Sequence, residues 1–305
     1  MLIVKRDFEA FLDTINTITI LLPITAFNGE STTFNLIDED TNHQITITES
    51  CTIEGKRKYI CRAPFPIELG KTYYIIDQHN RKTDLQVGAV IRTKEFDEMH
   101  YYDGKDLGVS YFEKESIFCL WAPTASAVKV KLTSPDQIET QHNLVREENG
   151  IWRLTVNGNL EGYEYTYLVC VNLIWREAVD PYTKATNRNN TKGIIINLEK
   201  TKIQKVKSAS TTQHPTDAVI YEVHVRDFSI HPSSGMKHKG KYLAFTEKNT
   251  VTAKGKKSGV NYLKDLGVTH IELLPVNAFG GIDEKTKYNW GYNPILFNTP
   301  EGSYS

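Results

Sequence analysis

The hydrophobic pattern of this chain changes once, near residue 217, and that change constrains the fold most strongly. Before it, short segments such as 44–48 and 128–132 alternate polar and apolar side chains between turn residues. A period of two is typical of antiparallel strands with one buried face. After it, residues 218–225 are mostly apolar, as in strands buried on both faces. We therefore expect β-rich modules followed by an α/β module.

Residues 1–100 and 101–200 each predict one all-β sandwich of the immunoglobulin type. The candidate strands are 17–22, 44–48, 58–61 and 72–76 in the first module, and 117–121, 128–132, 150–156 and 164–169 in the second. Asn-Gly pairs at 149–150 and 157–158 favour tight hairpin turns in the second module. The polar, Lys-containing stretch 201–216 predicts a linker.

Residues 217–305 predict the start of a (β/α)8 TIM barrel. After the strand 218–225, Ser258 is placed to cap a helix that ends at Gly267, and a second buried strand, 268–275, follows at once. A strand, a helix and a strand in this order form a parallel pair with a crossover. A complete barrel needs eight strands and typically about 250 residues. We therefore expect only two strands and one helix of the barrel here, so the barrel is incomplete in this chain.

Charge, hydropathy and cysteine spacing exclude several classes of protein. Lys and Arg total 36 against 37 Asp and Glu, so the chain lacks the basic excess of a dedicated nucleic-acid binder. No apolar window has the length of a membrane span, and no signal peptide is readable at the start, which predicts a cytoplasmic protein. We find no motif for a cofactor and no ligand cluster for a metal ion. Four cysteines without C-x-x-C spacing predict buried, reduced thiols (Cys51, Cys61, Cys119 and Cys170).

Polar residues near the ends of the two predicted barrel strands have two interpretations. Glu222, His224 and Arg226 alternate along one strand, and His270 and Glu272 alternate along the other. Such side chains either line an active site or form a hydrogen-bonded polar network that orients their neighbours. The loop 229–257 holds seven lysines, and the balanced charge of the chain favours a solvated loop over a phosphate-binding surface.

The run from Tyr288 to Pro294 is the most distinctive candidate site. Tyr288, Trp290 and Tyr292 alternate with Asn289 and Gly291, and Asn293 follows. Rings held on a loop can stack on the apolar faces of sugars, while Asn side chains exchange hydrogen bonds with hydroxyls. The alternative is a loop that fills the mouth of the barrel with its own aromatic side chains.

The run YNWGYNP resembles the signature of type I pullulanases, debranching glycosidases of family 13 in the α-amylase superfamily. Residues 218–229 and 267–276 resemble the first two barrel strands of that family. Trp121-Ala122-Pro123 and residues 179–182 resemble the family 48 starch-binding sandwich. Residues 82–92 and the N-terminal module are similar to cytoplasmic Bacillus-type pullulanases, so the resemblance covers essentially the whole chain.

The resemblance implies hydrolysis of α-1,6-glucosidic bonds in pullulan, glycogen and limit dextrins with retention of configuration. Retention requires a carboxylate nucleophile and a second carboxyl as acid/base. In the family these lie on barrel strands four and five, with a supporting Asp on strand seven, which we expect beyond Ser305. We therefore assign no catalytic residue, and we expect this chain to be inactive by itself.

What the resemblance transfers to this chain is substrate binding. Tyr292 matches the tyrosine that stacks on sugar at the cleavage subsite, and the same pocket is shaped by Tyr288, Asn289, Trp290 and Asn293. In the second module, Trp121 and Trp152 are either sugar platforms or core aromatics. The remaining alternative is a non-catalytic α-glucan-binding protein.

Overall fold

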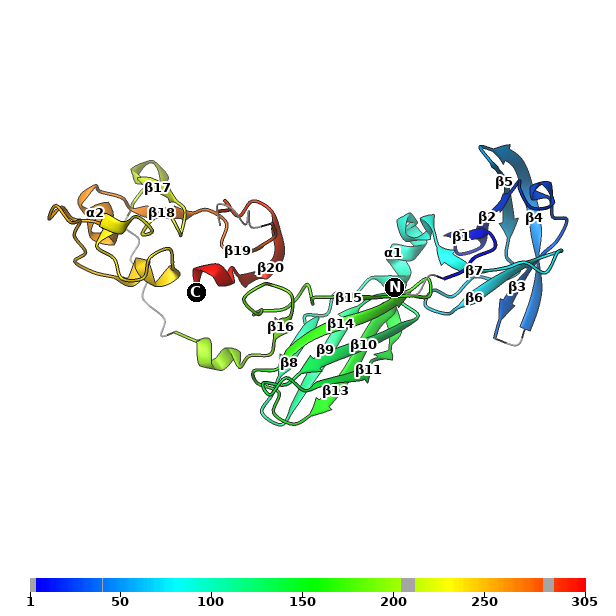
Figure 1. Cartoon of the computed structure of the whole chain (residues 1–305), viewed down its shortest axis with the longest axis horizontal. Helices are drawn as coiled ribbons and strands as arrows, with labels where there is room; N and C mark the ends of the chain where they lie inside the picture. Colours follow the sequence, from blue (N-terminus) through cyan, green and yellow to red (C-terminus); the bar gives the residue numbers. More distant parts are fainter. Residues whose placement is uncertain (1–3, 40, 204–211, 282–287) are drawn as a thin grey trace. The chain divides into compact units, whose positions relative to one another are not determined.

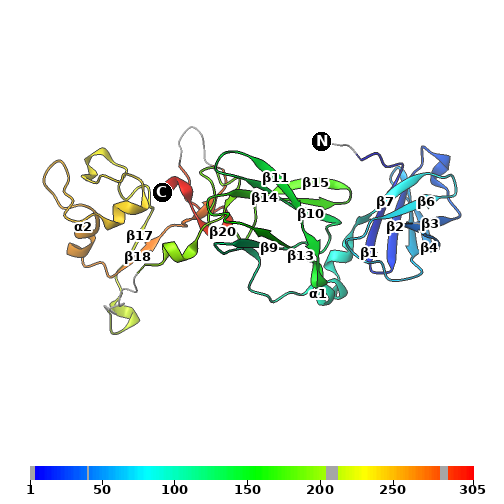
Figure 2. The same ribbon diagram turned by 90° about the horizontal axis from the view of Figure 1, so that it is seen from below.

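The computed structural model describes residues 4–39, 41–203, 212–281 and 288–305, which form two compact units (Figures 1 and 2). The first unit spans Met1–Ser110, Lys114–Gly158 and Thr166–Ala178, and the second spans Tyr111–Glu113, Asn159–Tyr165 and Val179–Ser305. Half of the predicted linker 201–216 lies outside the described residues, since 204–211 are not described.

The first seven strands form a closed barrel in the order β1-β2-β5-β4-β3-β6-β7. Their bounds are β1 Glu9–Thr14, β2 Thr17–Pro23, β3 Phe34–Asp38, β4 Thr41–Ile53, β5 Lys56–Arg62, β6 Tyr73–Asp77 and β7 Lys82–Val87. β1 pairs antiparallel with β2 and parallel with β7, and this parallel pairing closes the barrel. The predicted immunoglobulin-like sandwich for residues 1–100 is therefore wrong.

Closure depends on strand pairing that alternation cannot reveal. β4 is 13 residues long, pairs with both β3 and β5, and carries a register shift between Ile47 and Glu49. Bulges of this kind bend a strand and increase its twist, which lets one continuous sheet curl on itself. Inward-facing side chains alternate along a strand both in a sandwich and in a closed barrel. In the barrel of this chain, Ile18, Ile20 and Leu22 of β2 are fully buried.

The next strands form the predicted β-sandwich, with two sheets that Figure 2 shows as separate layers. One sheet has the order β12-β13-β9-β8, and the other has the order β11-β10-β14-β15 with β16 also paired to β14. The bounds are β8 Gly108–Tyr111, β9 Glu115–Trp121, β10 Ala127–Thr133, β11 Glu139–Asn143, β12 Val145–Arg146, β13 Ile151–Asn157, β14 Glu164–Val171, β15 Ile174–Ala178 and β16 Gly193–Ile194. The core buries Phe118, Ile151 and Tyr167.

The last part contains the predicted strand, helix and strand, each shorter than expected. β17 (Ile220–Val223) and β18 (His270–Leu273) pair in parallel, and α2 (Gly259–Asp265) lies between them in the sequence. Ser258 precedes α2 as predicted, but its hydroxyl donates to the Ser234 carbonyl rather than capping the helix. A second, antiparallel pair, β19 (Asn277–Phe279) and β20 (Pro294–Pro300), was not predicted.

Helix α1 (Lys94–His100) connects the barrel and the sandwich within the first unit and ends on a half-buried histidine. Thr93 caps the helix, since its hydroxyl accepts from the Phe96 amide at 3.2 Å. Burial, and then the Arg146 charge, lower the pKa of His100. Among the described residues, the His100 Nδ1 atom has no hydrogen-bond partner.

We expect the first unit to lose stability as the pH falls below about 6.5, the usual pKa of histidine. Unfolded chains take up a proton on His100 there, whereas the folded chain resists it, so this contribution is lost as pH falls through the folded pKa. Urea midpoints at pH 7.5 and pH 5 measure the change. In His100→Gln the difference between the two midpoints should shrink; an unchanged difference would contradict the assignment.

Candidate functional site

The loop 288–293 is held against the end of β19 by its two asparagines. The Asn289 side-chain amide donates to the carbonyls of Gly280 and Gly281, each at 3.1 Å, and its Oδ1 accepts from the Gly291 amide at 2.7 Å. The Asn293 amide also donates to the Gly280 carbonyl. These amide groups therefore fix the shape of the loop.

His224 fastens the same loop from the side of β17. Its imidazole is almost fully buried, and Nε2 lies 2.9 Å from the Asn289 carbonyl oxygen. Because a carbonyl only accepts, the proton sits on Nε2, and Nδ1 then accepts from the Asp227 amide at 3.4 Å. Of the two interpretations for this residue, the structure supports the polar network.

Tyr288 is held by an ionic pair that follows β17. Its hydroxyl donates to Asp227 at 2.8 Å, and the Arg226 guanidinium lies 5.4 Å from the centre of its ring. Arg226 also pairs with Asp227 at 3.1 Å. Burial and the Asp227 carboxylate raise the pKa of Tyr288. Tyr288 is thus a fixed wall of the loop.

Trp290 and Tyr292 are the two loop aromatics that face solvent. Their exposed fractions are 61% and 64%. The Tyr292 hydroxyl donates to the Glu222 carboxylate at 3.4 Å, a long contact that orients the ring only weakly. A rigid loop that leaves two large rings accessible is suited to stacking against a flat ligand with apolar faces.

Two predicted features, the polar residues of the first strand and the aromatic loop, therefore come together near the carboxyl end of β17. Glu222, His224 and Arg226 contact Tyr292, Asn289 and Tyr288, respectively, and Asp227, which was not predicted, also contacts Tyr288. Within the described part of the chain, the two residues predicted on the second strand make no hydrogen bond to this group: the His270 ring contacts the Thr269 hydroxyl, and Glu272 is exposed on β18.

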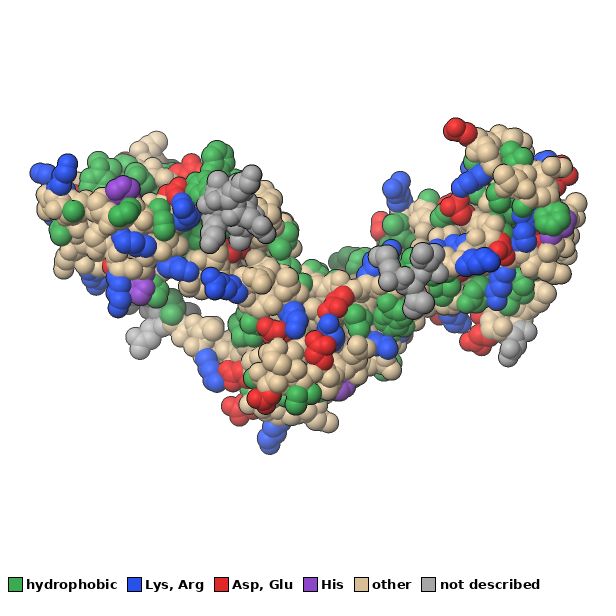
Figure 3. All heavy atoms as spheres, in the orientation of Figure 1, with side chains coloured by type: hydrophobic (Ala, Val, Ile, Leu, Met, Phe, Trp, Pro, Cys, Tyr) green, Lys and Arg blue, Asp and Glu red, His purple; other side chains and the backbone are tan. Residues whose placement is uncertain are grey.

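The Lys-rich loop 229–257 uses several of its lysines in local structure. Lys239 donates to the carbonyls of His231 and Pro232, and Lys257 pairs with Asp265 at 2.6 Å. The Glu247 carboxylate accepts from the amides of Lys237 and His238, which lower its pKa. Lys and Arg side chains are spread over one face of this part of the chain (Figure 3).

The described ranges contain neither a metal-binding cluster nor a helix that could span a membrane. No group of three or more His, Cys, Asp or Glu side chains there is arranged to hold a metal ion. Every helix in the same ranges is too short or too polar to cross a lipid bilayer.

Two family models match this chain. The Pullulanase N1-terminal domain matches residues 8–92, and Carbohydrate-binding module 48 (isoamylase N-terminal domain) matches residues 106–183. Pullulanase of Bacillus subtilis strain 168 is 46% identical over 309 residues, covering all of this chain and 42% of the relative. The chain belongs to the pullulanase family, and it corresponds to the N-terminal portion of Bacillus-type pullulanases.

Solved pullulanase structures share this fold. The B. subtilis strain 168 type I pullulanase complexed with maltose has a TM-score of 0.92 and 45% identity over all of this chain and 43% of that one. The Anoxybacillus sp. LM18-11 pullulanase complexed with maltotriose also has a TM-score of 0.92 and 45% identity, over 98% of this chain and 44% of that one. This chain therefore spans less than half the length of these pullulanases.

In this member of the pullulanase family, the sandwich exposes a tryptophan that sequence reasoning missed. Trp152 is buried in the core, and Trp121 is 42% exposed with its indole N–H donating to the His100 carbonyl at 2.9 Å. Trp175 on β15 is 44% exposed, and the Lys129 ammonium lies 5.1 Å from the centre of its ring. In the sequence, the exposure of this ring was indicated only by its place in an Ile-Trp-Arg-Glu segment that follows a short turn.

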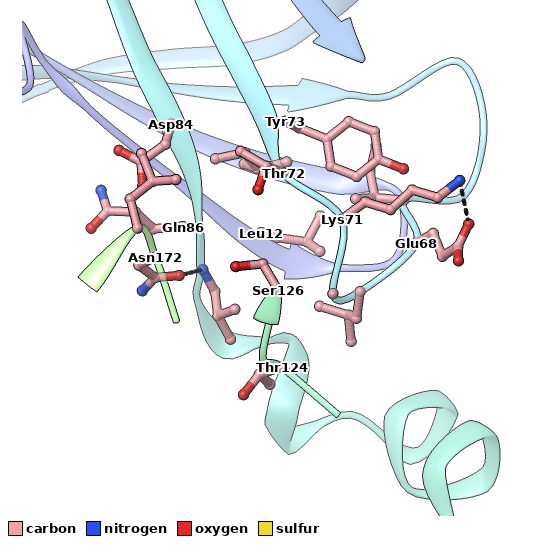
Figure 4. A pocket seen from close by; sticks show the side chains of 16 residues that line it. Leu12, Glu68, Lys71, Thr72, Tyr73, Asp84, Gln86, Thr124, Ser126 and Asn172 are labelled. Carbon is pink, nitrogen blue, oxygen red and sulfur yellow. Dashed lines mark hydrogen bonds and ion pairs between the residues drawn. The ribbon is translucent and has the colours of Figure 1, made fainter. Parts of the chain in front are cut away.

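The first unit also has a small polar cavity between barrel strands and sandwich residues (Figure 4). Asn172 accepts from the Val87 amide at 3.0 Å, and Arg6 bridges Asp84 and the Asn172 carbonyl. These contacts join the two modules within the unit, so its lining groups are largely used in structure.

The cysteine prediction holds for three residues and is wrong for one. Cys61, Cys119 and Cys170 are buried thiols, whereas Cys51 lies exposed on β4. Burial raises the pKa of Cys61 to about 12 and that of Cys119 to about 11, which keeps both as unreactive thiols near neutral pH. Cys51 was mispredicted because β4 extends beyond its buried portion.

Proposed function

We propose that this chain is the N-terminal part of a debranching glycosidase that hydrolyses α-1,6-glucosidic bonds in pullulan, glycogen and limit dextrins. The observation that carries the proposal is the loop 288–293, which is held near the carboxyl end of β17 through Asn289 and exposes the Trp290 and Tyr292 rings. Active sites of β/α barrels occupy that end of the strands. Tyr292 stacks on the sugar next to the bond that is cleaved, with Tyr288, Asn289, Trp290 and Asn293 shaping the pocket.

The barrel itself is also part of the proposal: residues 217–305 supply its first two parallel strands and first crossover helix. Ile220, Ile271 and Leu273 of the strand pair are 61%, 41% and 42% exposed. Parallel strands are normally covered on both faces, so these side chains are suited to burial by further barrel elements. The nucleophile, the acid/base and the supporting Asp belong to later strands of the complete barrel.

The other modules bind and position α-glucan in this proposal. We divide the chain into residues 1–100, the sandwich 101–200, a linker 201–216 and the barrel start 217–305, and we place the protein in the cytoplasm. Within the sandwich, Trp175 and the neighbouring Lys129 form the surface best suited to a glucan chain, because the ring is accessible and the ammonium can donate to hydroxyls.

We expect Trp175→Ala to weaken the retention of this chain by amylopectin about tenfold, as the loss of a large stacking ring does at other interfaces. Affinity electrophoresis in gels with and without the polysaccharide measures the dissociation constant. Tyr101→Ala, which also removes an exposed aromatic ring, is the matched control and should bind as the wild type. Equal retention of the wild type, Trp175→Ala and Tyr101→Ala would show that Trp175 does not bind glucan.

The mass of the protein in its native cells tests the catalytic part of the proposal. An antibody against residues 1–200 would capture it for intact mass measurement. A mass far above the 34.7 kDa of this chain is expected, because the barrel must be completed for hydrolysis. A mass of 34.7 kDa would leave glucan binding as the function.

A further inference from the structure

We propose that Glu301 is a positioning residue that couples the segment 183–190 to the aromatic loop 288–293 within the second unit. The coupling is a property of the fold, and its consequence for sugar binding rests on the function proposed above. Glu301 is only 1% exposed. Its two carboxylate oxygens together accept hydrogen bonds from three segments of the second unit.

On the side of the segment 183–190, Asn190 contacts Glu301. The Asn190 side-chain amide donates to Oε2 of Glu301 at 3.2 Å. Nearby, the Thr299 hydroxyl donates to the Thr183 carbonyl at 2.8 Å in a buried contact. Residues 183–190 belong to the same compact unit as Glu301, so these contacts hold the segment 299–301 against another part of that unit.

On the side of the loop, the same carboxylate oxygen holds β19. Oε2 of Glu301 also accepts from the Phe279 amide at 3.3 Å. The next residue, Gly280, provides the carbonyl that receives both the Asn289 and the Asn293 amides. Oε2 of Glu301 therefore binds the residue directly before Gly280, whose carbonyl holds the aromatic loop.

A second route from Glu301 reaches the loop through Tyr304. Oε1 of Glu301 accepts from the Ser303 amide at 2.8 Å and caps the short 3-10 helix Gly302–Tyr304. The Tyr304 hydroxyl lies 3.0 Å from Nε2 of His224, which in turn contacts the Asn289 carbonyl. Both routes thus converge on Asn289.

The hydrogen bonds to the buried Glu301 carboxylate position the segments that donate them, which an apolar side chain of the same size could not do. Burying a carboxylate is costly unless its oxygens are hydrogen-bonded, and those of Glu301 are held by neutral N–H groups. The directional bonds fix β19 and the 3-10 helix relative to the segment 183–190. Loss of the carboxylate should therefore loosen the loop before it unfolds the module.

Hydrogen exchange of the 305-residue chain, followed by mass spectrometry, tests the proposal without any ligand. In Glu301→Ala we expect peptides covering 288–293 to exchange about tenfold faster, while amides of β9 and β13 keep their protection. Asn190→Ala should produce a smaller change in the same peptides, and Glu301→Gln should lie between wild type and Glu301→Ala. Asn189→Ala, at the exposed neighbouring asparagine, is the matched control and should leave the loop unchanged.

The outcomes separate this proposal from the proposed function. Unchanged exchange at 288–293 in Glu301→Ala, or equally faster exchange throughout β9 and β13, would overturn the positioning role. A parallel titration with maltotriose should show weaker binding in Glu301→Ala and partial rescue by Glu301→Gln. If the loop loosens as expected but wild-type chain shows no maltotriose binding, the coupling stands and the sugar-binding role of the loop fails.

Discussion

Asp180→Ala is expected to destabilise the sandwich by about 3 kcal/mol, because it removes a buried carboxyl group that accepts two hydrogen bonds. The Asp180 side chain is fully buried; it accepts from the Tyr165 hydroxyl at 2.8 Å and from the Tyr182 amide at 2.8 Å. The measurement is urea unfolding followed by hydrogen exchange at β14, the strand that carries Tyr165. A loss below about 0.5 kcal/mol would contradict the role of the carboxyl.

The isosteric variant Asp180→Asn tests the same site with charge alone removed. Its oxygen can still accept from the Tyr182 amide, and its amide can donate to the Tyr165 hydroxyl, so we expect a loss of about 1 kcal/mol or less. Burial raises the pKa of Asp180 above its usual value near 3.8. The contribution of this group to the free energy of unfolding is therefore fully present at pH values below about 4 and is lost as pH rises through the folded pKa. The advantage of wild type over Asp180→Asn should shrink from pH 4 to pH 7.

In the enzyme with a completed barrel, Tyr292→Ala is expected to lower kcat/KM for pullulan about 100-fold. The ring is 64% exposed on a loop whose backbone is held by Asn289 and Asn293, so the substitution removes the stacking surface and leaves those contacts in place. Steady-state kinetics of reducing-end release measures the effect, with circular dichroism to verify the fold. Near-normal turnover would exclude stacking by Tyr292.

The variant Tyr292→Phe separates the ring from its hydroxyl. It keeps the aromatic surface and loses only the long hydrogen bond to Glu222. We expect it to retain most of the wild-type kcat/KM, since a contact of 3.4 Å contributes little. A loss as large as that of Tyr292→Ala would assign the effect to the Glu222 contact instead of stacking.

Sequence periodicity predicted most individual strands correctly, but it did not predict that the first seven strands close into a barrel. β2, β5, β9 and β10 lie where alternation places them, because a side chain must face either the core or solvent. The same alternation is present in a sandwich and in a closed barrel. The parallel pairing of Leu12 with Val87, which helps close the barrel, joins strands far apart in the sequence and has no local signature.

The candidate site was predicted as a set of residue types, and its contacts were not. The run Tyr288–Asn293 stood out because three aromatics alternating with amides and a glycine suit neither a strand nor a helix interior. The accessibility of each ring depends on residues distant in the sequence. Asp227 accepts a hydrogen bond from Tyr288, whereas Trp290 and Tyr292 remain exposed. The Asn side chains, predicted to meet hydroxyls, instead donate to backbone carbonyls.

The amino-acid sequence by itself determined the order of the modules, the strand–helix–strand unit, the identity of the aromatic loop and the resemblance to pullulanases. These follow from local periodicity, turn residues and contiguous motifs, which need no knowledge of distant contacts. The tertiary structure decided the closed barrel, the exposure of Trp175 and Cys51, and the link from Asn190 through Glu301 to Phe279. Those features depend on contacts between residues up to 111 positions apart, and such pairings are selected by the packing of the whole unit.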